Sequence, residues 1–130
     1  MTNQKNKPRE QVHLPEKLRE WEGEKIVETA KELAGRLKGG LDTQLRRVFD
    51  TFRKLEIDFR KEGFNRDEVL LLKPRLAYVV ARERKLSPIF TYLDEAIDRV
   101  YTEEDFFRLM KFAEAILAYY KYSSATGGQK

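Results

Sequence analysis

The sequence predicts an all-α protein, a compact bundle of about five helices with flexible N- and C-terminal tails. Through most of the 130 residues, apolar side chains recur at steps of three and four, the spacing that places them on one face of a helix. Strand-type alternation of apolar and polar residues is absent, and only four prolines interrupt the chain. At this length we expect a single helical domain.

The two ends of the chain differ from its middle. Residues 1–14 are polar, contain Pro8 and show no apolar period, so we expect a disordered or loosely attached segment. The last eight residues, SSATGGQK, predict a flexible tail over 123–130. The helical bundle is therefore expected over residues 15–122.

The first helix is predicted from Glu16 to Lys38, where apolar residues from Ile26 to Leu37 share one face. Gly23 weakens its start. Gly39 and Gly40 are expected to end it, because glycine readily adopts the left-handed conformation of a helix C-cap.

The second helix is predicted from Thr43 to Glu62, with Asp42 or Thr43 as its N-cap and Gly63 as its end. Its polar side carries two basic rows at seven-residue spacing, and each row follows one side of the helix because seven residues make nearly two turns. Asp50 is expected to pair partly with these cations. The two rows are Arg46, Arg53, Arg60 and Arg47, Lys54, Lys61.

The third helix is predicted from Arg66 to Lys85, with Pro74 either kinking it or starting a new helix in its first turn. The fourth begins at Ser87-Pro88, a cap followed by proline at the first helical position. Its outer side is expected to be acidic, through Asp94, Glu95 and Asp98.

The fifth helix is predicted to begin at Thr102, whose side chain can cap it ahead of three acidic residues. From Phe106 to Tyr120 it is apolar on nearly all sides. Such a helix is either central in the fold or half in an interface, and the small size of the domain favours a subunit interface.

The net charge of +4 is concentrated in one segment. Residues 73–85 carry five positive charges and one negative charge, whereas residues 86–105 carry one positive and six negative. Clustered positive charge is typical of proteins that bind a polyanion, although an ordinary solvated helix surface explains it as well.

Catalytic chemistry is not indicated. The chain has no cysteine, and its one histidine, His13, lies in the polar N-terminal segment. The serines fall at an expected helix cap, Ser87, and in the tail, and no glycine-rich phosphate loop is present. We expect no catalytic residues, no metal site and no cofactor, and a cytoplasmic protein with neither a signal core nor a membrane span.

The remaining candidate function is binding to a nucleic-acid backbone, because Lys and Arg side chains placed along helices can contact successive phosphates without reading the base sequence. Tyrosines near these cations could stack on bases, but Tyr78, Tyr119 and Tyr120 lie near apolar stripes and are expected to pack. The basic candidates are Arg46, Arg47, Arg53, Lys54, Lys73, Arg75, Arg82, Arg84, Lys85 and Lys121.

Three ordered segments, LDTQLRRVFD at 41–50, LLKPRLAYVVAR at 71–82 and EDFFRLMKFAEAILAYYKY at 104–122, resemble a known family. They are similar to the small helical subunit of the type III-A CRISPR effector, the Csm complex. The matching positions include Gln44 and Arg46 in the first segment and Lys73-Pro74-Arg75 in the second. At Tyr120 the family often has histidine.

The resemblance implies a non-catalytic structural subunit of an RNA-guided antiviral defense complex. Several copies would stack along its inner filament beside the guide RNA–target RNA duplex, contacting mainly the target backbone and other Csm-complex subunits. The apolar fifth helix, independently of the resemblance, also allows a free dimer. The expected RNA-binding residues are Gln44, Arg46, Arg47, Arg53, Lys54, Lys73, Arg75, Arg82, Arg84 and Lys121.

Charge complementarity suggests a further contact, in which acidic residues 86–105 of one copy meet basic residues 73–85 of the next. The alternative function is a helical protein–protein adaptor or dimerisation module without nucleic-acid binding.

Overall fold

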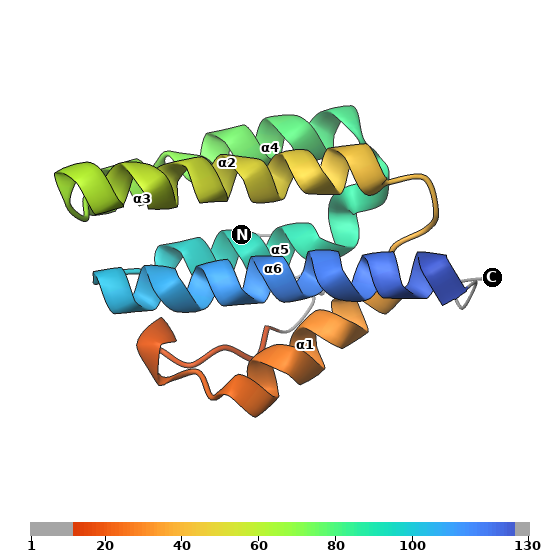
Figure 1. The fold of residues 1–130 in the computed structure, drawn as a ribbon, viewed down its shortest axis with the longest axis horizontal. Coiled ribbons are helices and arrows are strands. Elements are labelled where there is room, and N and C mark those ends of the chain that lie inside the picture. The colour runs from red at the N-terminus through yellow and green to blue at the C-terminus, as the bar shows by residue number, and fades with distance from the viewer. Residues whose placement is uncertain (1–11, 127–130) are drawn as a thin grey trace, which may run out of the picture.

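The computed structural model describes residues 12–126, and within that range every regular element is a helix, which confirms the predicted all-α fold (Figure 1). The predicted helical regions are all present, and the third is divided in two. The elements are η2 (Leu18–Glu20), α1 (Gly23–Gly35), α2 (Asp42–Glu62), α3 (Arg66–Leu70), α4 (Leu72–Arg82), η3 (Arg84–Leu86), α5 (Ser87–Asp98) and α6 (Glu103–Thr126).

The helices form layers around α6 (Figure 1). On one side, α2 runs next to the α3–α4 segment, which returns antiparallel to it. Helices α5 and α6 lie in the middle, and α1 with η2 covers the other side. Because α6 packs against η2, α1, α2 and α5, it is the central helix of the fold.

Aromatic packing fixes α6 in this position. Phe112 on α6 lies 4.7 Å from the ring of Trp21 and 6.3 Å from that of Tyr92. Phe106, six residues earlier, meets Phe59 of α2 at 5.1 Å between ring centroids. The apolar residues of α6 are thus covered mainly by the chain's own helices, which fits a central helix, while Phe107 remains exposed.

The start of the bundle differs in detail from the prediction. Residues 16–22 do not extend α1; they include the short η2, and α1 begins at Gly23. Helix α1 ends at Gly35, so Gly39 and Gly40 lie in the connection to α2 rather than at the helix end, with Gly40 at a φ of 85°. That connection is held by Tyr120, whose hydroxyl donates to the Lys38 carbonyl and accepts from the Leu41 amide, each at 3.0 Å.

Helix α2 begins at Asp42, with Leu41 in the N-cap position and no side-chain cap, so the predicted cap by Asp42 or Thr43 is wrong. Its end at Gly63, which has a φ of 91°, is confirmed. A positive φ is inexpensive for glycine, which has no Cβ.

The predicted third helix breaks at Leu71, between α3 and α4. Pro74 is the third residue of α4, where a backbone N–H would have no intrahelical acceptor, so proline is tolerated in the first turn. Of the two predicted roles of Pro74, the start of a new helix is therefore correct and the kink is wrong.

Helix α5 begins at Ser87 as predicted, with Pro88 in its first turn, but Ser87 is not the cap. Its hydroxyl donates backward to the Arg84 carbonyl at 2.6 Å. Thr102 does cap α6, accepting from the Asp105 amide at 3.2 Å. Helix α6 continues to Thr126, so the expected tail boundary at residue 123 is too early, and residues 127–130 lie outside the described part.

Asp105 ties the start of α6 to the N-terminal part of the chain. Its carboxylate, which is fully buried, accepts from the backbone amides of Tyr101, Thr102 and Arg19 and pairs with the Arg19 guanidinium at 3.0 Å. Burial alone would raise the pKa of Asp105, but these amides and Arg19 outweigh it and lower that pKa.

Residues 12–14, expected to be loosely attached, contact the bundle, while residues 1–11 lie outside the described part. The His13 amide donates to the Tyr92 hydroxyl at 3.3 Å, and the Leu14 carbonyl accepts from Arg99 at 2.9 Å. The His13 side chain itself is exposed, as the sequence suggested.

Candidate nucleic-acid interface

The two basic rows of α2 face different neighbours. Arg53 and Arg60 line a groove against α6, together with Phe107 and Lys111. Arg46 shares their side of α2 through its seven-residue spacing. Lys54 lines a cavity of about 150 Å³ on the opposite flank, between α2 and the α3–α4 segment.

On the α6 flank, the cations are partly neutralised by Glu56. Its carboxylate lies 3.6 Å from Arg53 Nε and 3.9 Å from Arg60 Nη2. Asp50, which was expected to pair with the basic rows, has no ion pair among the described residues, so that prediction is wrong. Lys121 belongs to the same flank and lies 4.0 Å from Asp42.

On the α4 flank, cations of two antiparallel helices come together. Lys54 and Arg75 line one cavity between α2 and the α3–α4 segment. One to two helical turns from them, Val48 of α2 and Val79 of α4 line a second, smaller cavity between the same two helices. Arg47 lies seven residues before Lys54 on α2, and Arg82 lies seven residues after Arg75 on α4. Because the two helices are antiparallel, Arg47 and Arg82 are both displaced by about 10 Å in the same direction from the level of Lys54 and Arg75. We call Arg47, Lys54, Arg75 and Arg82 the basic strip.

The side chains of the basic strip are available to solvent. All four residues are exposed, and within residues 12–126 none of them has a carboxylate partner within 4.0 Å. Asp58 and Glu68 line the cavity beside Lys54 and Arg75 without forming such a pair. The strip is thus a surface of positive charge that the described chain leaves unneutralised.

Tyr78 lies on the same face of α4, three residues after Arg75 and four before Arg82. It is 62% exposed, so the expectation that it packs is wrong, whereas Tyr120 is buried and Tyr119 packs partly against the core, as expected. The Tyr78 hydroxyl accepts from Arg82 Nη1 at 3.0 Å, and the Arg82 guanidinium lies 5.6 Å from the ring centroid. Its helical spacing from the two arginines was a sequence signal for this position.

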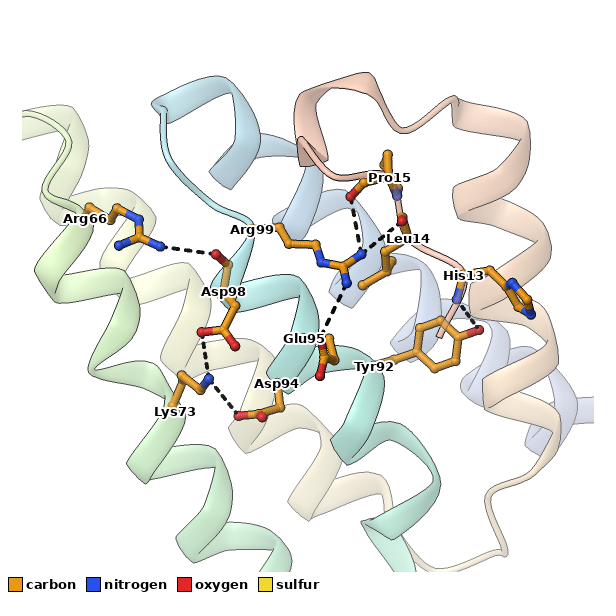
Figure 2. Close-up of polar contacts among 10 residues, drawn as sticks. All are labelled: His13, Leu14, Pro15, Arg66, Lys73, Tyr92, Asp94, Glu95, Asp98 and Arg99. Atoms are coloured by element: carbon orange, nitrogen blue, oxygen red, sulfur yellow. Dashed lines mark hydrogen bonds and ion pairs between the residues drawn. The ribbon is translucent and has the colours of Figure 1, made fainter. Parts of the chain in front are cut away.

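Lys73, two residues before Arg75, points the other way, toward α5 (Figure 2). Its ammonium lies 2.7 Å from Asp98 Oδ1 and 3.6 Å from Asp94 Oδ1, and its side chain is 29% exposed. Partial burial alone would lower the pKa of Lys73, but the Asp98 hydrogen bond and the charges of Asp94 and Asp98 outweigh it and raise that pKa. We call Lys73, Asp94 and Asp98 the α4–α5 ion-pair cluster.

Two arginines extend this polar contact on either side (Figure 2). Arg66 donates to the carbonyls of Val100 and Asp98 at 2.8 and 3.1 Å. Arg99 donates to the Leu14 carbonyl and lies 3.4 Å from Glu95 Oε1.

The acidic side of α5 is therefore turned largely toward cations of its own chain. Asp94, Glu95 and Asp98 are half-buried rather than lying on the outer side of α5, where they were expected. The charge complementarity between residues 73–85 and 86–105 is satisfied, at Lys73, inside one chain.

The ten predicted RNA-binding residues thus fall on separate surfaces. Arg47, Lys54, Arg75 and Arg82 form the basic strip, and Gln44 is half-buried on the same side of α2 as Thr51 of the cavity. Arg84 is exposed in η3, directly after α4. Arg46, Arg53 and Lys121 lie toward α6, and Lys73 is in the α4–α5 ion-pair cluster.

A cavity of about 540 Å³ lies away from these cations, between α1 and the N-terminal segment. Trp21 and Tyr92 line it, with His13 and several glutamates at its walls. No group of three or more acidic or histidine side chains in the described residues is arranged to hold a metal ion. None of the helices described is long and apolar enough to cross a membrane.

Comparison with known proteins places the chain by its sequence. The family described as Csm2 Type III-A matches residues 20–126, which include every helix from α1 to α6. Comparison with curated proteins and with solved structures gives no match.

Proposed function

The chain belongs to the Csm2 type III-A family and is a subunit of a type III-A CRISPR complex, and from this premise we propose that it binds RNA there through the basic strip. Its partners in the complex are other Csm subunits. The proposed role is structural: copies of the chain line the inner filament and hold the target strand of the guide RNA–target RNA duplex.

One observation carries the proposal: the basic strip is exposed and lacks carboxylate partners within the described chain. Unpaired, solvated cations in two parallel lines repel one another mildly and gain most from a polyanion. Guanidinium and ammonium groups donate hydrogen bonds to phosphate oxygens but do not read base edges in this arrangement. The expected binding is therefore independent of RNA sequence.

The proposed role includes no catalytic step. Arginine and lysine side chains of the strip supply positive charge and hydrogen-bond donors, which position a backbone. Two carboxylates, Asp58 and Glu68, line the cavity beside Lys54 and Arg75 and would repel phosphate rather than bind it.

The two basic rows of α2 provide a matched test. The variant Arg47→Ala/Lys54→Ala removes two charges from the α4 flank, and Arg46→Ala/Arg53→Ala removes two charges one residue earlier, on the α6 flank. Each variant is assembled into the complete Csm complex with guide RNA, and its affinity for target RNA is measured across a salt series.

We expect the first variant to lower affinity roughly tenfold and to reduce the slope of log K against log salt by about 0.7 to 0.9 for each lost phosphate contact. The second variant should change affinity by less than about twofold. Equal losses would mean that both flanks bind RNA. Unchanged affinity of the first variant, with altered assembly, would instead favour the adaptor function.

A further inference from the structure

Tyr78 is an exposed aromatic ring within a surface of positive charge. Its neighbours on the same face of α4 are Arg75, one turn before it, and Arg82, one turn after it. The ring is 62% exposed and belongs to no apolar cluster of the described chain. An amphipathic side chain at this place can contact both the phosphates and the bases of a bound strand.

The contact with Arg82 holds the Tyr78 ring in place and leaves groups available. Arg82 Nη1 donates to the hydroxyl, so the hydroxyl's own proton can be donated to another acceptor, such as a phosphate oxygen. The guanidinium lies 5.6 Å from the ring centroid, a cation–π contact that orients the ring.

From this geometry we infer that Tyr78 stacks on an unpaired base of the RNA strand whose phosphates lie along the basic strip. The inference rests on the proposed function and deepens it by naming the ligand of this ring. The base must be unpaired and splayed out, because the faces of bases inside a continuous duplex are already covered by their neighbours. Stacking on an aromatic ring tolerates any base, so this contact preserves binding that is independent of sequence.

Tyr101 offers a matched control. It is also an exposed tyrosine, 55% accessible, and an arginine guanidinium, that of Arg66, lies 4.3 Å from its ring centroid. Arg66, however, is bound to the carbonyls of Val100 and Asp98, at the α5 end of the α4–α5 ion-pair cluster and away from the basic strip. The two tyrosines therefore share chemistry and exposure but differ in their surroundings.

The test uses the complete Csm complex and a set of target RNAs, each with one abasic nucleotide at a successive position. Affinity is measured for complexes that contain the wild-type chain, Tyr78→Ala, Tyr78→Phe or Tyr101→Ala. Every complex meets the same loss of pairing with the guide, so the difference between chains isolates the stacking contact.

With the wild-type chain, we expect an abasic nucleotide at the stacking positions to lower affinity about fivefold more than with Tyr78→Ala, the lower end of the range for stacking on one base. Tyr78→Phe, which keeps the ring, and Tyr101→Ala should both keep the wild-type dependence of affinity on the abasic position.

Identical position profiles for wild type and Tyr78→Ala would overturn the inference. So would a uniform loss with every target, which would show that Tyr78 only positions Arg82, or a failure of Tyr78→Ala to join the other subunits, which would make it a protein contact. The Arg47→Ala/Lys54→Ala variant tests the proposed function separately, because it removes contacts to the RNA backbone and leaves the Tyr78 ring in place.

Discussion

Helix α4 contributes cations both to the basic strip and to the α4–α5 ion-pair cluster, but those in the strip lack carboxylate partners among the described residues and the one in the cluster is paired. Arg75 is exposed and has no carboxylate partner among residues 12–126, whereas Lys73, two residues earlier, is held by Asp98 at 2.7 Å. Two residues along an α-helix differ by about 200° in direction, so one side chain faces the α2 flank and the other faces α5. Positive charge in a sequence thus predicts a polyanion site only on the face that its own chain leaves unpaired.

The strongest contrast to the basic strip is the ion pair between half-buried Arg19 and fully buried Asp105. Replacing Asp105 with Ala removes the carboxylate from Arg19 and from three backbone amides, and we expect a loss of about 3 kcal/mol in the free energy of unfolding. Urea denaturation measures it. Asp42→Ala, which affects an exposed contact of 4.0 Å with Lys121, should change stability by less than about 0.5 kcal/mol.

The Asp105 carboxylate should also make the free energy of unfolding depend on pH in the acidic range. Because the pKa of Asp105 is lowered in the folded state, its contribution is complete above the unfolded pKa, near 3.8, and is lost as pH falls through the folded pKa. Urea midpoints of wild type and Asp105→Asn should therefore differ at pH 7 and converge in strong acid. A constant difference down to the lowest pH would contradict the proposed coupling.

Separate alanine substitutions of Lys73 and Arg75 test the comparison directly. Lys73→Ala breaks the α4–α5 ion-pair cluster and should lower the free energy of unfolding by about 1 kcal/mol, with less than a twofold effect on RNA affinity. Arg75→Ala should leave stability within about 0.5 kcal/mol and lower RNA affinity about fivefold. The reverse pattern would place the RNA on the α5 side.

Alkaline pH should weaken the α4–α5 ion-pair cluster. The raised pKa of Lys73 means that its contribution to stability is complete below the unfolded value, near 10.5, and is lost as pH rises through the folded pKa. The difference in unfolding free energy between wild type and Lys73→Ala, about 1 kcal/mol or less, should shrink as the pH rises beyond 10.5.

The smallest effect is expected on the α6 flank of α2. Glu56→Gln removes the carboxylate shared by Arg53 and Arg60, both exposed, and should change stability by less than about 0.5 kcal/mol. If these arginines bound RNA once released, target affinity would rise; we expect a change of less than twofold.

Several features of the fold were predictable from local chemistry. The α2 end at Gly63, the Pro88 start of α5 and the Thr102 cap of α6 depend on neighbouring residues only, and all three are present. Caps that compete with tertiary contacts were not predictable. Ser87 bonds backward to Arg84, and the start of α2 is held by Tyr120, which is distant in sequence.

The candidate site was predictable in composition but not in arrangement. Seven-residue spacing correctly separated the two rows of α2, yet nothing in the spacing said which row faces α4 and which faces α6. The nearness of Tyr78 to apolar residues predicts packing, whereas its helical spacing from Arg75 and Arg82 indicates the exposed position that the structure shows.

The sequence by itself determined the all-α fold and, through its three ordered motifs, the Csm2 family, because helical periodicity and local motifs are properties of adjacent residues. Only the tertiary structure decided which charges are neutralised. The α3–α4 break and the packing of α5 bring Asp94 and Asp98 to Lys73 and leave Arg75 beside Lys54. Electrostatic pairing depends on distance in space, and that distance is set by how the helices pack.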